Sequence, residues 1–172
     1  HAFIDQSAAV VMTSVATVMG HFPLVLVSGP VGDHGIAVML AREQFGLSGE
    51  LRSDSASVLP LTRAIRDFPD LKFMRDPTRG GLATVAHEIA RASGHSVALE
   101  QNAVPLRPEV VSVCEMLGYD PYFLACEGRV VAVADPYAAN DVLACWRALP
   151  EGRDACIIGR IEAGDSRVIL ET

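Results

Sequence analysis

Short apolar runs alternate along the chain with segments whose apolar residues recur at helical spacing, and glycines and prolines separate them. Leu24–Val27 is short and rich in β-branched residues, which predicts a buried strand. Residues 36–45 carry apolar residues at helical spacing and predict a helix. Asp54 or Ser55 is a candidate N-cap for a further helix over residues 57–67. The first part of the chain is therefore expected to form a strand followed by two helices.

The second part of the chain continues this alternation. Asp135 and Pro136 are a strong helix start, with Asp as N-cap and Pro in the first turn. Glu127 and Gly128 stand between two apolar runs, which predicts a hairpin. The other expected elements are strands over residues 71–74, 97–99, 122–126, 129–134, 155–161 and 167–170, and helices over residues 78–91, 108–117 and 136–149. Mixed βα units and hairpins predict an α+β fold with a mixed sheet flanked by helices.

The composition is typical of a folded domain. Of 172 residues, 50% are hydrophobic and 20% are charged, which excludes intrinsic disorder as the main state. The formal net charge of −7 argues against nucleic acid or an anionic membrane as a partner. Residues 8–19 are apolar but too few to cross a bilayer. We expect an atypical segment of uncertain origin over residues 1–20 and one domain over residues 21–172.

The cysteines show no spacing that is typical of a metal site. They are Cys114, Cys126, Cys145 and Cys156, with no C-x-x-C pair among them. Neither a zinc site nor a thioredoxin-like pair is indicated, and no metal site is predicted. Reduced thiols in a cytoplasmic protein are the expected state, since no secretory signal is visible.

The sharpest local motif is the loop of residues 76–81, between an expected strand and an expected amphipathic helix. A glycine pair there would let the backbone approach a ligand, and the N–H groups of the helix start, with Arg79, would favour an anion. The alternative is a tight turn that binds nothing. The loop is not a Walker A motif, because it has no G-K-[ST]. Its candidate residues are Asp76, Thr78, Arg79, Gly80 and Gly81.

Two further places could hold functional side chains. The loop of residues 28–35 also joins an expected strand to an expected helix, but its glycines are not in the dinucleotide-binding order. Its candidate residues are Gly32, Asp33, His34 and Gly35. Asp33 and His34 either cap the helix or approach a ligand. Glu127, beside a glycine on a turn, is either solvated or, if it faces a cleft, suited to proton transfer.

Several strings follow one another in an order that resembles a known family. The string G-D-H-G-I-A occupies residues 32–37 and R-D-P-T-R-G-G occupies residues 75–81, and together they are highly specific. The others are L-R-S-D at 51–54, C-E-M-L-G-Y-D-P at 114–121, A-C-E-G at 125–128 and G-R-D-A-C-I-I-G at 152–159. Over residues 23–170 the chain resembles the C-terminal, PurM-like (AIR synthase-related) domain of the hydrogenase maturation family HypE.

This resemblance implies a three-layer fold like the C-terminal domain of PurM, with a mixed sheet between helices. It also implies a reaction, in which ATP with magnesium serves to dehydrate a carbamoyl group on a C-terminal cysteine to a thiocyanate for nickel–iron hydrogenase. Partners implied by the family are a second copy in a homodimer, the carbamoyltransferase HypF and the scaffold pair HypC and HypD, all cytoplasmic. By resemblance, Glu127 is the catalytic acid/base, and the 76–81 loop lies near the phosphates.

The chain departs from the family pattern in places that bear on activity. Cys126 stands where the family has Asn, so the hydrogen bonds of that amide are lost, and Ser55 stands where the family often has Cys. The 172 residues include neither the N-terminal nucleotide-binding domain nor a cysteine after Cys156. We therefore expect this chain to be inactive alone, and the sequence supports no cofactor for it by itself.

Two other functions stay open. A stand-alone interaction or self-associating module, derived from a HypE-like gene, is the alternative that the apolar residues 8–19 suggest. Another ATP-using member of the same superfamily is the third hypothesis. His34 and Arg79 favour HypE over that third hypothesis.

Overall fold

The computed structural model describes residues 22–43 and 51–172, and the expected segment 1–20 with its apolar stretch lies outside them. The strands are β1 (Leu24–Val27), β2 (Leu71–Arg75), β3 (Ser96–Glu100), β4 (Val131–Ala134), β5 (Cys156–Glu162) and β6 (Val168–Glu171). The helices are α1 (Asp33–Glu43), α2 (Leu59–Ile65), α3 (Gly81–Ser93), α4 (Pro108–Leu117) and α5 (Pro136–Arg147), with 3₁₀ turns η1 (Gln101–Ala103), η2 (Pro121–Phe123) and η3 (Pro150–Gly152).

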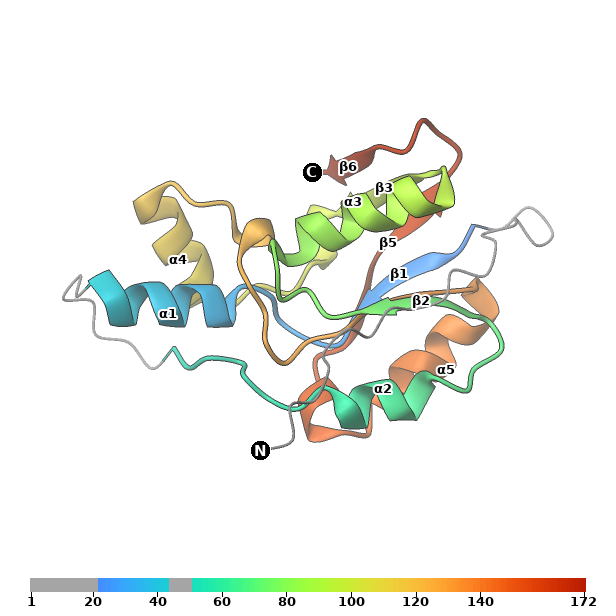
Figure 1. The fold of residues 1–172 in the computed structure, drawn as a ribbon, viewed down its shortest axis with the longest axis horizontal. Helices are drawn as coiled ribbons and strands as arrows, with labels where there is room; N and C mark the ends of the chain where they lie inside the picture. The colour runs from blue at the N-terminus through green and yellow to red at the C-terminus, as the bar shows by residue number, and fades with distance from the viewer. Residues whose placement is uncertain (1–21, 44–50) are drawn as a thin grey trace.

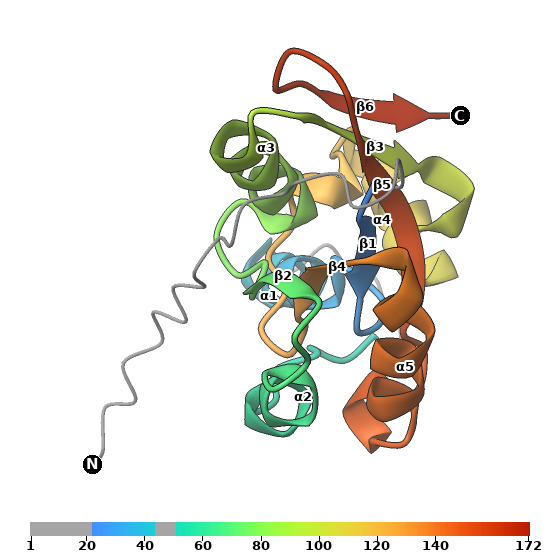
Figure 2. The same ribbon diagram turned by 90° about the vertical axis from the view of Figure 1, so that its right-hand side faces the viewer.

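The described strands form one sheet in the order β2-β4-β1-β5-β3-β6. Neighbouring strands are antiparallel except β3 and β6, which are parallel. Helix α3 lies on one side of the sheet, and α2 and α5 lie on the other (Figures 1 and 2). The mixed sheet and the three layers expected from the sequence are therefore confirmed.

Each face of the sheet is covered by an apolar helix surface. On one side, α3 packs with β1, β3 and β5 in a cluster that includes Val25, Val85, Ile89, Val97 and Ile161. On the other side, α2 and α5 pack over β1 and β4, and the buried Trp146 donates from Nε1 to the Leu61 carbonyl at 3.0 Å. Burying one valine, leucine or isoleucine side chain stabilises the fold by about 1.5–3 kcal/mol. Packing of these side chains therefore holds the helices on the sheet.

Helices α1 and α4 lie beyond the end of the sheet rather than over it (Figure 1). They pack on each other through a third apolar cluster that includes Ile36, Val110, Val113 and Cys114. Asp33, the first residue of α1, pairs with Arg107, which precedes α4, at 2.8 Å. This third cluster holds the glycine-rich loop of residues 28–35 in place at the end of β1.

Within the described residues, the expected strands and helices are found within a few residues of their bounds, except the strand expected over residues 122–126. Residues 44–45 of the first expected helix lie outside the described residues. The expected hairpin around Glu127 and Gly128 is wrong. Residues 121–123 form η2, and β4 pairs with β1 and β2 instead of with the segment before it. The backbone of residues 125–127 is bonded to other loops, and both sides of β4 are taken by β1 and β2, so the segment before β4 cannot pair with it.

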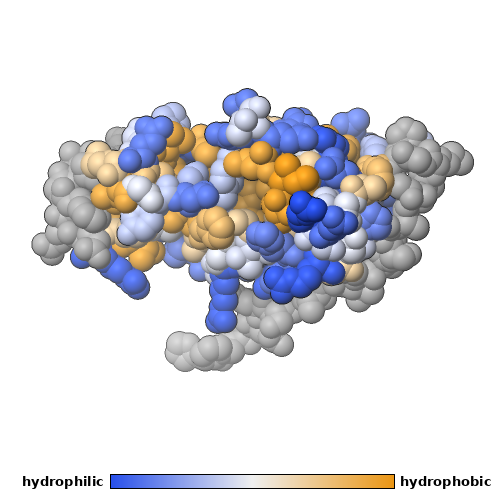
Figure 3. All heavy atoms as spheres, turned by 90° about the horizontal axis from the view of Figure 1, so that it is seen from above, coloured by the Kyte–Doolittle hydropathy of each residue, from blue (hydrophilic) through white to orange (hydrophobic). Residues whose placement is uncertain are grey.

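The surface of the described part mixes apolar and charged areas. On the face seen from above, apolar areas are separated by hydrophilic ones (Figure 3). Met116, Tyr119 and Phe123, at the end of α4 and just after it, are exposed. Among residues 22–43 and 51–172, no helix is both long and apolar enough to span a membrane.

Candidate functional site

The sheet topology brings the three motif loops together. β4 lies between β1 and β2 and is antiparallel to both, with Val131 opposite Val27 on one side and opposite Arg75 on the other. The last residues of β1 and β2 and the first residues of β4 therefore lie side by side at one end of the strands, which is the edge of the sheet meant below. Loops 28–35, 76–81 and 124–130 leave or enter the sheet there, so segments far apart in the sequence become neighbours.

The segment before β4 is the centre of this arrangement. The carbonyl of Ala125 accepts a hydrogen bond from Gly35 N at 3.1 Å, and Cys126 N donates to the Pro77 carbonyl at 3.2 Å. Thr78 Oγ1 donates to the carbonyl of Cys126 at 3.2 Å. The backbone of residues 125–126 is thus bonded to both motif loops, and these bonds replace the expected hairpin.

The glycines of both loops make room for this same segment. A Cβ on Gly81 would lie 2.4 Å from the Tyr122 carbonyl oxygen, and a Cβ on Gly35 would lie 2.9 Å from Cβ of Leu124. Gly80, at the N-cap of α3, is exposed and has a φ of 71°. The close approach at Gly81 is therefore to the chain's own backbone, which supports the tight-turn alternative there and leaves Gly80 and the exposed Arg79 facing outward.

Cys126 accepts a hydrogen bond from the glycine-rich loop of residues 28–35. Its Sγ accepts a hydrogen bond from Gly32 N at 3.3 Å, and Gly32 has a φ of 87°. The thiol thus makes a hydrogen bond of its own at the position where the resemblance leads one to expect an amide. Burial raises the pKa of the Cys126 thiol to about 12, so this sulfur is a structural acceptor and not a nucleophile.

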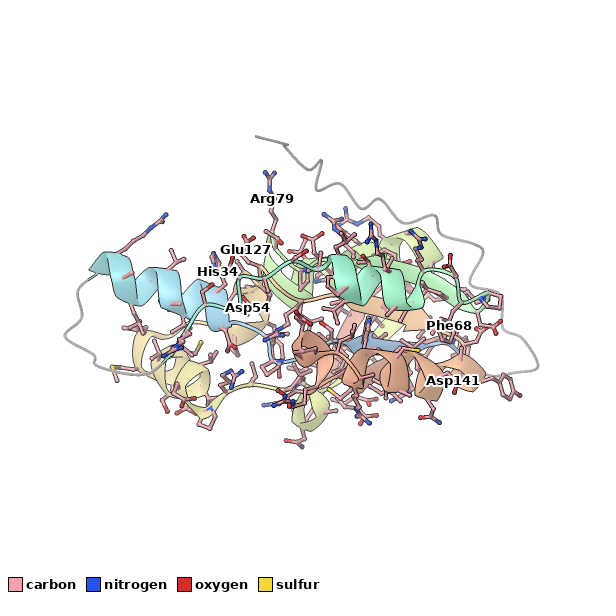
Figure 4. The ribbon with its side chains drawn as sticks, turned by 90° about the horizontal axis from the view of Figure 1, so that it is seen from below. His34, Asp54, Phe68, Arg79, Glu127 and Asp141 are labelled. Carbon is pink, nitrogen blue, oxygen red and sulfur yellow. The ribbon has the colours of Figure 1, made fainter. Side chains whose placement is uncertain are left out.

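Glu127 and His34 lie next to each other and form the reactive pair proposed for this site. His34 Nε2 lies 3.9 Å from Glu127 Oε1, and the two side chains are 25% and 32% exposed. A hydrogen bond of 2.8 Å joins His34 Nδ1 to Ser53 Oγ. Figure 4 shows His34 and Glu127 side by side, with Arg79 projecting from the same part of the molecule. Glu127 is therefore neither free in solvent nor buried, and it faces a second proton-exchanging group.

Asp54 lies beneath this pair and was expected as a helix N-cap. Its Oδ1 accepts a hydrogen bond from Glu127 N at 3.1 Å, and its Oδ2 lies 3.4 Å from Arg129 Nε in an ion pair. The Asp54 side chain has no exposed area. Helix α2 begins only at Leu59, without a side-chain cap. Sequence reasoning missed Asp54 and Ser53 as site residues, although they belong to the L-R-S-D string.

Asp33 is a buried carboxyl at the start of α1. Its Oδ2 accepts a hydrogen bond from Arg107 Nε at 2.8 Å, whereas its Oδ1 is buried without a hydrogen-bond partner. Loss of solvation raises the pKa of Asp33, although the Arg107 hydrogen bond and charge act in the opposite direction. Asp33 thus joins α1 to α4 beneath the loop and does not itself reach solvent.

The remaining candidates lie on the 76–81 loop. Asp76 is half-buried after β2, and Thr78 is used to hold Cys126, as described above. Within the described residues, no group of three or more His, Cys, Asp or Glu side chains is arranged to hold a metal ion. The arrangement supplies an acid/base pair and one exposed guanidinium.

This fold and these loops define a class of protein. The family of AIR synthase related proteins, C-terminal domain, matches residues 23–171, and the chain belongs to it. Thiamine monophosphate kinase from Aquifex aeolicus has the same fold, with a TM-score of 0.63, and at 21% identity that likeness shows the fold alone.

Within this family the chain is similar to HypE. It is 46% identical to carbamoyl dehydratase HypE of Escherichia coli (strain K12) over 138 residues, 80% of this chain and 41% of that protein. It is 39% identical to that of Azotobacter vinelandii over 150 residues, 86% of this chain and 44% of that protein. A crystal structure of E. coli HypE matches with a TM-score of 0.85 at 41% identity, over 92% of this chain and 49% of that one.

These matches confirm the resemblance to HypE that the motifs indicate. The chain spans less than half the length of the curated relatives named above, 41% and 44%. The PurM-like fold class is confirmed together with the family.

Proposed function

We propose that this chain is the C-terminal domain of a HypE-type hydrogenase maturation protein, whose reaction is the ATP-dependent dehydration of a cysteine-bound carbamoyl group to a thiocyanate. The observation that carries the proposal is the position of Glu127 and His34, 3.9 Å apart, at the edge where all three motif loops meet. The identity to carbamoyl dehydratases over most of the chain supports it.

The proposed reaction needs a base at one particular step. Transfer of a phosphoryl group from ATP to the carbamoyl oxygen releases ADP and one of the two N–H protons. It leaves a C=NH group and a phosphorylated oxygen that can depart as phosphate. Loss of phosphate then forms the carbon–nitrogen triple bond only if the nitrogen gives up its remaining proton. Glu127 is the proposed acceptor of this proton, because its carboxylate is partly exposed and its backbone N–H is held by Asp54.

The 76–81 loop is the proposed phosphate side of the site. Arg79 is exposed there, and the loop leads into the N-terminus of α3, where helix dipole and guanidinium both favour an anion. With a formal net charge of −7, the chain as a whole repels anions, so such local groups must bind the phosphate. The described residues of this chain do not fit a resident magnesium site, and no step here depends on one.

Cofactor and partners are part of the proposal. A structure of HypE in complex with ATP matches with a TM-score of 0.82 at 34% identity, and a HypE–HypF complex matches with a TM-score of 0.84 at 37% identity. These relatives support ATP and HypF as the ligand and partner of a protein that contains this domain. A homodimer, a HypC–HypD scaffold and a cytoplasmic location are proposed from the family resemblance. Magnesium is proposed for the whole protein only, held outside the described residues of this chain.

None of the four cysteines is suited to carry the carbamoyl group. Cys114 and Cys126 are buried, and Cys145 and Cys156 are partly buried within the fold. Burial raises the pKa of the Cys114 and Cys156 thiols as well as that of Cys126. We propose that the 172-residue chain alone forms no adduct, and mass spectrometry after incubation with HypF, carbamoyl phosphate and ATP tests this. A carbamoyl or cyano adduct on any of the four would contradict it.

A chimera tests the function itself. Residues 23–171 replace the matching part of E. coli HypE, so that the relative supplies the rest of the protein. After carbamoylation by HypF, addition of ATP should remove one water from the modified cysteine, as seen by mass spectrometry. A chimera that folds and stays carbamoylated, while unaltered E. coli HypE is dehydrated in parallel, would contradict the proposal.

A further inference from the structure

The loop of residues 51–57 lies against the Glu127 turn, and its Asp54 accepts the hydrogen bond from Glu127 N. The loop has no regular secondary structure and precedes α2. A Cβ on Gly128 would lie 2.0 Å from the carbonyl oxygen of Asp54. Glycine at 128 is therefore required by the close approach of this loop, and the two backbone segments are packed directly on each other.

Two successive residues of this loop each hold one member of the reactive pair. Ser53 Oγ is 2.8 Å from His34 Nδ1, and the same oxygen accepts a hydrogen bond from Ser55 N at 3.0 Å. The next residue, Asp54, accepts from the N–H of Glu127 at 3.1 Å. One dipeptide therefore connects His34 and Glu127, which are 93 residues apart in sequence.

The other oxygen of the Asp54 carboxylate, Oδ2, is buried without a hydrogen-bond partner and is paired with Arg129 by charge. Arg129, which pairs with it at 3.4 Å, also donates from Nε to the Pro30 carbonyl at 3.0 Å and from Nη1 to the Glu151 carbonyl at 3.0 Å. The Arg129 side chain is 11% exposed and that of Asp54 has no exposed area. Rotation of Asp54 away from Arg129 would leave a buried charge unpaired, which favours the orientation in which Oδ1 accepts from Glu127 N.

We propose that Ser53 and Asp54 are positioning residues that together hold His34 and Glu127 against each other at the edge of the sheet. The inference rests on the proposed function for the chemical role of Glu127, but the positioning is a property of this chain alone. A loss of position of about 1 Å lowers catalytic rates by roughly 100-fold in enzymes. Asp54 and Ser53 should therefore act on turnover more than on ATP binding.

A matched control lies elsewhere in the fold. Lys72 Nζ pairs with Asp135 Oδ2 at 2.9 Å, with side chains 14% and 9% exposed, between β2 and the start of α5. Asp135→Ala breaks a similarly buried ion pair that touches none of the candidate residues. It shows whether breaking a buried ion pair outside the site also moves Glu127 or lowers turnover.

The experiment has one structural and one kinetic arm. Crystal structures of the 172-residue chain with Asp54→Ala, Ser53→Ala and Asp135→Ala should show the separation of His34 Nε2 and Glu127 Oε1 increased in the first two and unchanged in the third. In the chimera, Asp54→Ala should lower kcat roughly 10- to 100-fold with the KM for ATP unchanged. Asp54→Asn, which keeps an acceptor for Glu127 N, should recover part of the rate.

The outcomes are separable. An unmoved Glu127 in Asp54→Ala, or an equal loss of kcat in Asp135→Ala, would overturn the positioning role. An unsubstituted chimera without activity would count against the proposed function only, because the crystal structures still decide the position of Glu127. If Asp54→Ala does not fold, Ser53→Ala decides the question, since it leaves the buried Asp54–Arg129 pair intact.

Discussion

Two buried ion pairs of similar exposure lie in different parts of this molecule. Lys72 and Asp135 join the edge strand β2 to the start of α5, with 14% and 9% of their side chains exposed. Asp54 and Arg129 lie under the Glu127 turn, with 0% and 11% exposed. The Lys72 ammonium group ends a flexible side chain on the edge strand, whereas the Arg129 guanidinium also donates hydrogen bonds to two backbone carbonyls.

This difference separates a structural pair from one that supports a site. The Lys72–Asp135 pair joins the edge strand β2 to the N-cap of α5, and neither residue belongs to a motif loop. The Asp54–Arg129 pair ties together the residues that follow β1, the loop before α2 and the turn before β4. A buried charge pair costs desolvation in either place, so the second pair gains its importance from the groups that it holds.

The largest expected effect comes from breaking the two pairs. Asp54→Ala leaves the Arg129 charge buried and the Glu127 N–H without its acceptor, and should lower the free energy of unfolding by about 3–5 kcal/mol. Asp135→Ala should cost less, about 1–3 kcal/mol, because the lysine can extend toward water. Urea unfolding of both variants measures this. Equal losses would contradict the distinction between the pairs.

A smaller loss of stability is expected when a methyl group is added at Gly128. Gly128→Ala places a Cβ 2.0 Å from the Asp54 carbonyl oxygen, so the backbone must move, at a cost of about 1–3 kcal/mol. Gly94→Ala is a control of similar cost, about 1–2 kcal/mol, because its φ is 72° and nothing lies within 4 Å of the new Cβ. In NMR spectra, only Gly128→Ala should shift the His34 ring resonances. A shift of the same size in Gly94→Ala would contradict the local explanation.

The smallest effect is a change in pH dependence. Burial raises the pKa of Asp33. The Asp33 carboxyl therefore stays protonated to a higher pH in the folded chain than in the unfolded chain. The corresponding stability is complete below about pH 4 and is lost as the pH rises through the folded-state pKa. Asp33→Asn cannot ionise, so above about pH 4 its free energy of unfolding should fall less than that of the unsubstituted chain.

Urea unfolding over a pH series at constant ionic strength measures this difference. Asp141→Asn, which removes an exposed carboxylate on α5, should keep the pH profile of the unsubstituted chain. Parallel profiles for Asp33→Asn and the unsubstituted chain would show that Asp33 does not titrate differently on folding.

Helix α3 and the candidate site differ in how far the sequence predicts them. The helix that contains Val85 and Ile89 is recognised from spacing alone, because a single apolar face determines both its form and its place on the sheet. Its ends follow from Gly80 and Gly94, whose backbone is left-handed. Local pattern and packing point to the same structure here, so the prediction is confirmed.

The site is less predictable because its contacts join residues far apart in the chain. Asp54 looks like a helix cap in the sequence, and only the fold brings it to Glu127, 73 residues away. The hairpin prediction failed for the same reason, since the backbone N–H groups of Cys126 and Glu127 bond to other loops. The clue in the sequence was Gly128, which could have indicated a close backbone approach as well as a turn.

The most direct measurement of the central claim is the rate of dehydration in the chimera with Glu127→Gln. Glutamine keeps the size of the side chain and the backbone N–H that Asp54 accepts from, but it cannot take up the proton. In a single turnover started with ATP, followed by mass spectrometry, the account predicts a rate roughly 10²- to 10⁴-fold lower than in the unsubstituted chimera. A rate equal to that of the unsubstituted chimera would contradict the account.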